Sequence, residues 1–180
     1  MIKFIYVASP ILHKRHYLLF SNDIKNICQK YNIQILLTFL PTRNLLRKLS
    51  ISLSELSNYQ NIVFIDTLEH KNLILLLKKT DCLLFLSEQE SLGLPILEAV
   101  MNEIPVIAPN LSYATELLGS GYPYLFESAD IKNTRKSLIK IIKKFIYDFN
   151  SNQVKSHNKL NFKSIDDLVD LMFSKFKNNS

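Results

Sequence analysis

The sequence predicts an α/β protein built on a single doubly wound parallel sheet with C-terminal helices. Three observations support this fold class. Short apolar runs recur along the chain, and most are apolar at nearly every position, as in strands covered on both faces. Between them lie segments with apolar residues at three- and four-residue steps, the pattern of amphipathic helices. The chain has 180 residues, 47% of them hydrophobic, which is enough for one domain with a substantial core.

The runs and the periodic segments alternate along the chain, as a parallel sheet requires. The expected strands are 2–8, 33–39, 61–65, 81–87, 104–109 and 122–126. The expected helices are 15–30, 70–79, one that begins at Pro95, 130–147 and 164–177. Residues 40–60 are less regular and are expected to hold one short helix. Gly119 stands where a helix would end.

The composition limits the partners and the compartment. The net charge of +6 favours anionic partners, such as a phosphorylated small molecule, an acidic membrane surface or nucleic acid. The densest basic cluster, Lys136, Lys140, Lys143 and Lys144, is interpreted as a solvated helix face. Cys28 and Cys82 lie in apolar patterns typical of buried, reduced thiols. No run is long enough to span a membrane and the N-terminus does not resemble a signal peptide, so a cytoplasmic location is expected.

The loop "EQESLGL" after the fourth expected strand is the first candidate for chemistry. Pro95 suits the first turn of a helix, so the amides of Leu92, Gly93 and Leu94 would converge near its positive end and could hold phosphate. Glu90 opens the loop, and Glu98 is expected in the first turn of that helix. Carboxylates accept hydrogen bonds from sugar hydroxyls. By spacing alone, the two acids could equally be a solvated loop acid and a helix-dipole partner.

The loop after the first strand, "SPILHKRHY", is the second candidate. Lys14 and Arg15 are expected at the start of the next helix, where a lysine can neutralise a diphosphate. His13 and His16 are three residues apart, but no acidic or cysteine partner has ligand spacing, so no metal site is predicted. The chain lacks a P-loop, a G-x-G-x-x-G motif after the first strand and a nucleophilic serine elbow.

Taken together, these motifs resemble a known family. "EQESLGLPILEAVMNEIPVIAPNLSYATELLG" looks like the donor-site signature of retaining family-4 glycosyltransferases of the GT-B fold, with two glutamates eight positions apart around a G-L-P turn. The opening "SPILHKRH" is similar to a subgroup common among bacterial polysaccharide transferases. The resemblance covers roughly 2–148 and implies one Rossmann-like half of a GT-B fold.

The resemblance implies roles for individual residues. Glu90 would contact the donor sugar and Lys14 would stabilise the leaving diphosphate, which makes these two the catalytic candidates. Glu98 would accept hydrogen bonds from the ribose, and Thr67 and Leu68 would border the base. The full set of predicted substrate-binding residues is Ser9, His13, Arg15, Thr67, Leu68, Ser91, Leu92, Gly93, Leu94 and Glu98. Neither a metal nor another cofactor is implied.

Three departures from the family pattern qualify this hypothesis. Ala8 and Ser9 stand where the family has Gly-Arg, with Arg15 as a substitute cation, and Leu92 replaces an aromatic residue. The family's N-terminal acceptor domain is absent from this sequence. Residues 1–150 are therefore predicted to be a donor-binding domain, and 151–180 a polar linker and a C-terminal helix.

The expected function is to bind a UDP- or GDP-linked sugar for retaining transfer in bacterial surface polysaccharide biosynthesis, such as O-antigen, lipopolysaccharide or capsule. A separate acceptor-domain protein is the expected partner, with peripheral contact to the inner face of an anionic membrane. Two alternatives stay open. One is a truncated, inactive fragment, and the other is a non-enzymatic basic binding module. Nucleic acid is not an expected partner, because no basic and aromatic stacking pattern is present.

Overall fold

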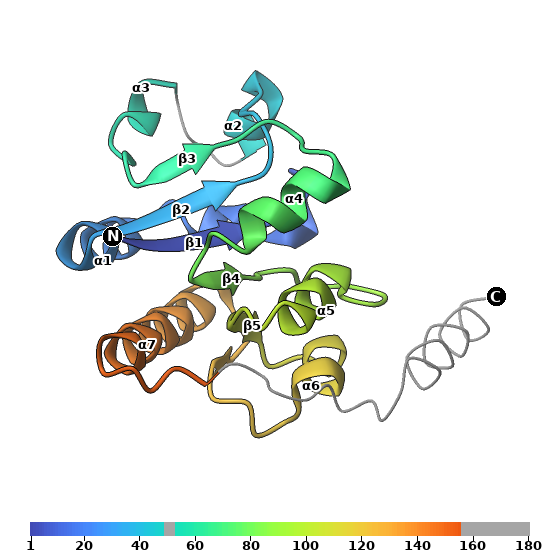
Figure 1. The fold of residues 1–180 in the computed structure, drawn as a ribbon. Coiled ribbons are helices and arrows are strands. Elements are labelled where there is room, and N and C mark those ends of the chain that lie inside the picture. The colour runs from blue at the N-terminus through green and yellow to red at the C-terminus, as the bar shows by residue number, and fades with distance from the viewer. Residues whose placement is uncertain (49–52, 156–180) are drawn as a thin grey trace.

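The computed structural model describes residues 1–48 and 53–155, and within them a six-stranded sheet forms the centre of the molecule (Figure 1). The strand order is β3-β2-β1-β4-β5-β6, and every neighbouring pair is parallel. The strands are β1 (Ile2–Tyr6), β2 (Ile33–Leu37), β3 (Ile62–Phe64), β4 (Cys82–Leu84), β5 (Val106–Pro109) and β6 (Leu125–Phe126). All six expected strands are confirmed, each within the predicted range. The order reverses between β1 and β4, which is where open α/β sheets bind ligands.

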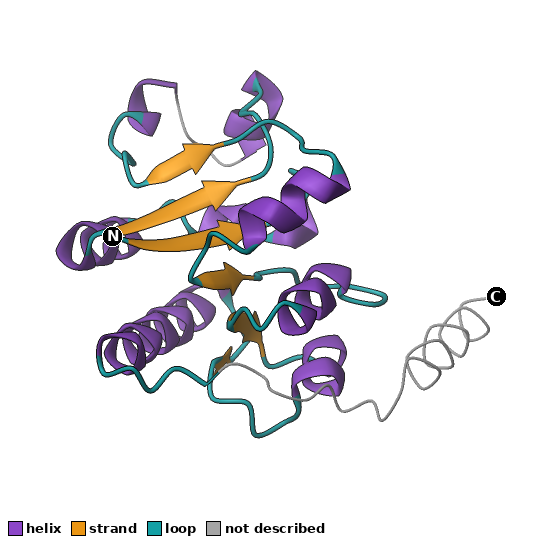
Figure 2. Ribbon diagram, viewed as in Figure 1, coloured by secondary structure: helices purple, strands orange, loops and turns teal. Residues whose placement is uncertain are grey.

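Helices cover both faces of this sheet, so the predicted doubly wound architecture is confirmed (Figure 2). The helices are α1 (Asn22–Tyr31), α2 (Arg43–Lys48), α3 (Leu53–Leu56), α4 (His70–Leu77), α5 (Leu94–Met101), α6 (Ser112–Leu118) and α7 (Ile131–Asn150). Helix α1 packs against α7 and helix α5 packs against α6. Figure 1 shows α1 and α7 together on one side of the strands and α4, α5 and α6 on the other.

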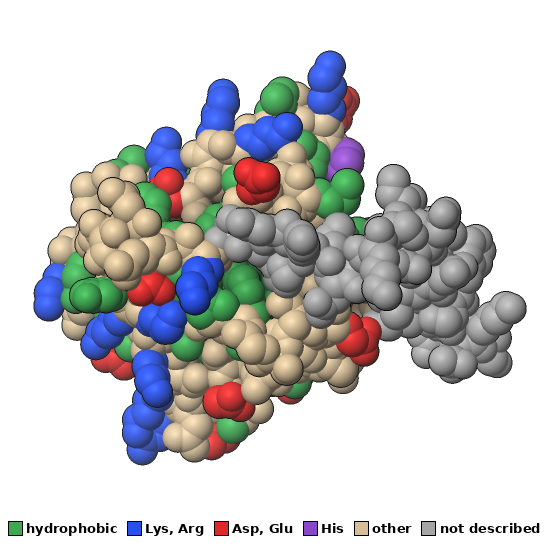
Figure 3. Space-filling model, turned by 60° about the horizontal axis from the view of Figure 1, so that its bottom comes forward, with side chains coloured by type: hydrophobic (Ala, Val, Ile, Leu, Met, Phe, Trp, Pro, Cys, Tyr) green, Lys and Arg blue, Asp and Glu red, His purple; other side chains and the backbone are tan. Residues whose placement is uncertain are grey.

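Charged side chains of both signs are interspersed over one face of the molecule (Figure 3). On the face drawn in Figure 3, Lys and Arg side chains alternate with Asp and Glu and do not form one continuous basic area. The predicted solvated face of α7 is confirmed, because Lys136, Lys140, Lys143 and Lys144 are all exposed. Among the described residues, no helix is long and apolar enough to cross a membrane.

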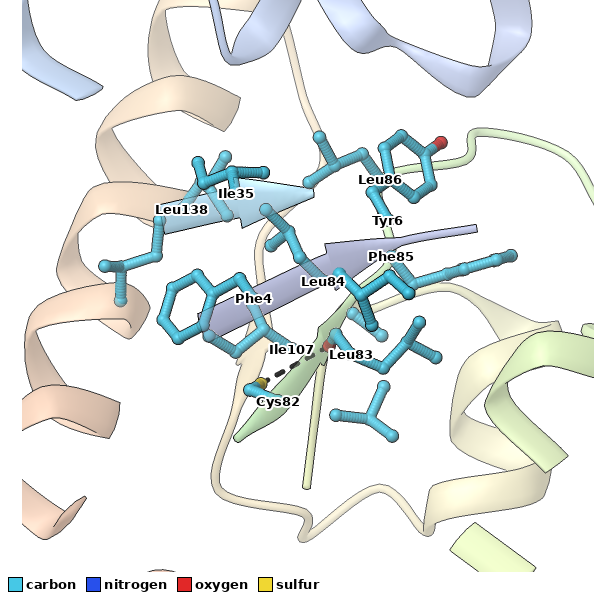
Figure 4. Packing of buried hydrophobic residues seen from close by; sticks show 14 of the residues in the cluster. Phe4, Tyr6, Ile35, Cys82, Leu83, Leu84, Phe85, Leu86, Ile107 and Leu138 are labelled. Carbon is cyan, nitrogen blue, oxygen red and sulfur yellow. Dashed lines mark hydrogen bonds between the residues drawn. The ribbon is translucent and has the colours of Figure 1, made fainter. Parts of the chain in front are cut away.

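The core lies on both faces of the central strands (Figure 4). In β1, Phe4, Ile5 and Tyr6 are fully buried, so this strand is covered on both sides as its continuous apolar pattern predicted. The ring of Phe4 meets Phe145 of α7 edge-on, with 5.5 Å between the ring centres. Cys28 and Cys82 are both buried free thiols, as the sequence predicted. The carboxyl ends of β1 and β4 are therefore anchored in a rigid core.

The helix expected over 15–30 begins seven residues later than predicted. Two 3-10 turns, Leu12–Lys14 and His16–Leu18, come first, and Arg15 between them has a left-handed backbone with φ of 51°. A residue with a left-handed backbone cannot continue an α-helix, so α1 begins only after Ser21. Ser21 is its N-cap, and the Ser21 hydroxyl accepts a hydrogen bond from the amide of Ile24. Lys14 and Arg15 thus lie in a tight turn rather than at a helix start.

In the described parts of the region 40–60, which are 40–48 and 53–60, there are two helical segments, α2 and α3, where one short helix was expected. Gly119 ends α6, as predicted, with a positive φ of 82°. The helix expected over 164–177, and with it most of the predicted segment 151–180, lies outside the described residues.

Candidate functional site

A cleft of about 330 Å³ opens at the carboxyl ends of β1, β2 and β3. It is lined by Val7, Ala8, Ser9, Pro10, Lys14, Thr38, Phe39, Thr67, Leu68 and Leu73. Four predicted site residues, Ser9, Lys14, Thr67 and Leu68, are therefore brought together from two separate loops. The cleft lies on the edge of the sheet where α/β proteins bind nucleotides. Its walls combine apolar side chains with the hydroxyl groups of Ser9, Thr38 and Thr67 and the Lys14 ammonium, a composition suited to a small polar organic ligand.

Lys14 and Glu90, the two predicted catalytic residues, form an ion pair at the rim of this cleft. The Lys14 ammonium donates to Glu90 Oε1, and both side chains are only 15% exposed. The Lys14 ammonium also lies 5.9 Å from the centre of the Phe85 ring, and the buried Tyr6 hydroxyl donates to the Lys14 carbonyl. The turn after β1 and the loop after β4 thus meet through the pair that the sequence singled out.

Arg15 lies elsewhere, although the sequence grouped it with the phosphate-binding residues. Its side chain is 7% exposed, donating through Nη2 to Glu88 Oε1 at 2.5 Å and through Nη1 to Ser128 Oγ at 2.6 Å. Arg15 does not line the cleft. Its role toward phosphate stays a prediction, and in this structure it ties the turn to the loops after β4 and β6.

His13 takes part through its backbone. Its carbonyl accepts a hydrogen bond of 2.8 Å from the amide of Glu88. Residues 13–15 and 88–90 are therefore joined by three contacts: this backbone bond, the Arg15–Glu88 pair and the Lys14–Glu90 pair. We call these two segments and their three contacts the turn–loop clasp.

The turn before α5 presents backbone amides. Gly93 is the residue before the helix and has φ of 61°, and a Cβ placed there would lie 3.3 Å from Leu117 Cδ1. The left-handed backbone therefore favours glycine here, and the packing beneath it leaves little room for a Cβ. Among the described residues, nothing accepts a hydrogen bond from the amides of Ser91 through Leu94. Ser91 and Leu94 are exposed and Leu92 is half-buried, so this turn is open on its outer side.

Glu98 lies in the second turn of α5, not in the first as the sequence suggested, because the helix begins at Leu94. Glu98 Oε1 is 2.8 Å from His70 Nε2 at the first position of α4. The Glu98 side chain is 25% exposed and that of His70 is 73% exposed. Glu98 thus faces the segment that carries Thr67 and Leu68, and it is separate from the Lys14–Glu90 pair.

Two buried residues that the sequence gave no reason to select support the clasp. His16 lies between the rings of Tyr6 and Phe39, and burial, with Lys14 nearby, lowers its pKa to about 4, so the imidazole is neutral. The Tyr113 hydroxyl donates to the Ser87 carbonyl at 2.5 Å. Burial, and next the charge of Glu90, raise the pKa of Tyr113, which keeps it protonated as a donor. Only the contacts between distant segments reveal these roles.

A metal site needs several acidic, thiol or imidazole side chains close together. Within 1–48 and 53–155, no group of three or more His, Cys, Asp or Glu side chains is placed to hold a metal ion. Lys14 lines the cleft, and Lys14 and Arg15 both supply cations to the clasp. The expectation of a site that works without metal stays a prediction.

The family comparison fits this arrangement. Residues 2–156 match the family described as glycosyl transferases group 1, and the chain belongs to this family. The match includes the cleft, the turn–loop clasp and both acids that flank the Gly93 turn. No curated protein sequence matches the chain.

Solved structures show the same fold. The chain is similar to the pneumococcal O-GlcNAc transferase GtfA in complex with UDP and GlcNAc, with a TM-score of 0.68 at 15% identity over 99% of this chain and 35% of that one. It is also similar to Anabaena Alr3699/HepE in complex with UDP and glucose, with a TM-score of 0.69 at 15% identity over 99% of this chain and 48% of that one. The chain thus has the fold of one half of a GT-B glycosyltransferase and spans less than half the length of these proteins.

Proposed function

We propose that this chain is the donor-binding domain of a glycosyltransferase, and that its cleft takes a nucleoside diphosphate sugar. The observation that carries the proposal is the Lys14–Glu90 pair at the rim of the cleft, beside the open amides of the Gly93 turn. A lysine and several free amides are what a diphosphate needs, and carboxylates accept hydrogen bonds from sugar hydroxyls. Both similar structures contain UDP, which favours a uridine nucleotide.

In the proposed complex each part of the site has one task. The base lies in the cleft against Thr67 and Leu68, and the diphosphate lies over Lys14 and the amides of Ser91–Leu94. When the bond between the anomeric carbon and the diphosphate breaks, negative charge grows on the leaving phosphate oxygen, and the Lys14 ammonium stabilises it. Glu90, released from Lys14, contacts the sugar near the reacting carbon. The oxygen of the acceptor hydroxyl forms the new bond to that carbon, and its proton passes to the leaving phosphate oxygen.

Transfer with retention of configuration is part of the proposal. It rests on the resemblance of the Glu90–Glu98 segment to retaining enzymes, with the acceptor attacking from the face that the diphosphate leaves. The anomeric configuration of the product, read from proton coupling constants, tests it. An inverted product would contradict the retaining assignment and leave donor binding untouched.

The acceptor side is proposed to come from another domain. Transfer needs an acceptor hydroxyl held against the anomeric carbon in a cleft closed to water. The chain spans 35% and 48% of the two similar structures, so it corresponds to less than half of such an assembly. We place its product in bacterial surface polysaccharide, made on the cytoplasmic side of the membrane. A donor domain without its acceptor half binds the donor and transfers poorly.

We also propose contact with an anionic membrane, supported by the exposed lysines of α7. The test is sedimentation with vesicles that contain phosphatidylserine, at low and high salt. Retention on these vesicles that salt abolishes supports a peripheral location. Equal recovery with neutral vesicles would refute it.

The central test is calorimetric titration of the folded chain with UDP, GDP and their glucose conjugates. We expect a uridine nucleotide to bind with a dissociation constant below one millimolar, and Lys14→Met to weaken it. Lys79→Met is the matched control, because Lys79 is an exposed lysine that does not line the cleft. Failure of every nucleotide to bind at millimolar concentration would refute the proposed function.

A further inference from the structure

We propose that His70 is a positioning residue for Glu98 and thereby sets the affinity of the site for the ribose of the nucleotide. This inference rests on the proposed function and adds a residue that the sequence did not select. Its basis is the contact of 2.8 Å between His70 Nε2 and Glu98 Oε1. The contact joins the start of α4 to the middle of α5, across the edge of the sheet where the cleft opens.

The backbone of Glu98 is already fixed by its surroundings. Its neighbours in α5, Leu97 and Ala99, are buried. Its carbonyl accepts a hydrogen bond of 2.7 Å from the side-chain amide of Asn102. The carboxylate itself is held by one contact. Among the described residues, His70 is the only side chain that hydrogen-bonds it. The direction in which Glu98 presents its oxygens therefore depends on His70.

The chemistry of the two groups determines which is the hydrogen-bond donor and which is the acceptor. An ionised carboxylate only accepts hydrogen bonds, so the Nε2–H of His70 donates to Oε1. The second oxygen, Oε2, and the remaining lone pair of Oε1 stay available for ligand hydroxyls. A carboxylate held at one oxygen offers these acceptors in one orientation and loses less side-chain freedom when a ligand binds.

The location of His70 connects this carboxylate to the cleft. Thr67 and Leu68, which line the cleft, precede His70 by only a few residues, and Leu73, which also lines it, follows on α4. His70 therefore lies on the segment that forms one wall of the cleft. Its donation to Glu98 places an acceptor next to that wall, where a ribose attached to a base in the cleft has its hydroxyls.

The test compares UDP with inorganic pyrophosphate, which has no ribose, by calorimetry on folded variants. We expect His70→Ala to weaken UDP binding about three- to tenfold, the range for the net loss of one ordinary hydrogen bond, and to leave pyrophosphate binding unchanged. His70→Gln, which keeps an N–H donor, should recover most of the affinity. Lys71→Ala is the control, because it removes a neighbouring exposed basic side chain that has no contact with Glu98.

A double-mutant cycle with Glu98→Ala decides whether His70 acts through Glu98. In the Glu98→Ala background, His70→Ala should change the UDP affinity by less than about twofold. Three results would overturn the inference: an equal loss of affinity for UDP and pyrophosphate, an undiminished effect of His70→Ala in the Glu98→Ala background, or no effect of His70→Ala at all. In each case, UDP binding by the wild type would still support the proposed function. If the folded wild type binds neither UDP nor pyrophosphate, the proposed function and the inference about His70 are both refuted.

Discussion

The two acids on either side of the Gly93 turn are held in contrasting ways. Glu90 pairs with Lys14, both partners are 15% exposed, and the pair belongs to the turn–loop clasp. Glu98 pairs with His70, whose side chain is 73% exposed, and no second contact supports the carboxylate among the described residues. One acid is part of the folded framework, whereas the other is held by a single surface contact.

Because of this difference, the two acids should contribute differently to stability and to ligand binding. A partly buried pair in a hydrogen-bonded framework is held in place without a ligand, which prepares the site for a group that acts on a reacting bond. An exposed pair contributes little to stability but can still orient one carboxylate. Substitutions in the clasp should therefore change both folding and ligand binding, whereas those at His70 should change ligand binding alone.

The largest effect is expected at Lys14. Lys14→Met keeps the length of the side chain and removes the charge that would stabilise the leaving diphosphate. In the assembled enzyme, or in donor hydrolysis by the chain alone, the rate should fall about 100-fold or more. The measurement is release of UDP from UDP-glucose, with Lys79→Met as the control. A rate within about threefold of wild type would show that Lys14 has no part in the chemistry.

The next effect is a loss of stability at low pH, caused by the buried His16 beneath the clasp. Its pKa in the folded chain is lowered to about 4 from an ordinary 6.5, so the unfolded chain binds a proton there more readily. Stability is therefore lost as the pH falls from about 6.5 toward 4, by about 3 kcal/mol in total. Urea unfolding at pH 7 and pH 4 should show a smaller acid loss in His16→Phe than in wild type. Equal losses would contradict this account.

The ion pair between the buried Arg15 and the half-exposed Glu88 predicts unequal costs. Glu88→Ala leaves a buried guanidinium with no acid, which should cost about 3 kcal/mol of unfolding free energy. Arg15→Met leaves an acid that is 50% exposed and can hydrate, so the cost should be about 2 kcal/mol after allowing for solvent screening. Urea unfolding of both variants measures the two costs. The reverse order would mean that the packing of Arg15, not its charge, matters.

Gly93→Ala should have a smaller effect. The left-handed backbone and the approach to Leu117 Cδ1 at 3.3 Å should together cost about 1–2 kcal/mol. Gly121→Ala is the matched control, since a Cβ there meets nothing within 4 Å. Thermal unfolding of the two variants gives the comparison, and equal melting temperatures would indicate that the turn before α5 adapts freely.

The smallest effect on stability is expected at His70. His70→Ala should change the unfolding free energy by less than about 0.5 kcal/mol, because the pair is exposed. Urea unfolding of this variant beside wild type provides the check. A loss above about 1 kcal/mol would place His70 in the framework and remove the contrast with the clasp.

The sequence was most informative where periodicity and residue type act locally. Each strand was predicted because its apolar run reports burial on both faces, and α5 was predicted because Pro95 follows the Gly93 turn. The Lys14–Glu90 contact agrees with grouping both residues at one sheet edge, since β1 and β4 are neighbours.

The failures have a common cause in contacts between distant segments. The helix over 15–30 was placed too early because Tyr17 and Phe20 fit a helical period, while the left-handed backbone at Arg15 has no signal in a residue that is not glycine. The partners of Arg15, Glu88 and Ser128, could not be predicted because they are 73 and 113 positions away, while the role of Arg15 toward phosphate stays a prediction. The His70–Glu98 contact was missed for the same reason.

The most direct test of the proposed donor site is a titration of the nitrogen-15-labelled chain with UDP, followed by amide chemical shifts. The account predicts that the amides of Ser9, Thr67, Ser91 and Gly93 shift together and give one dissociation constant. Shifts confined to the lysine-bearing face of α7, or none at millimolar UDP, would contradict it.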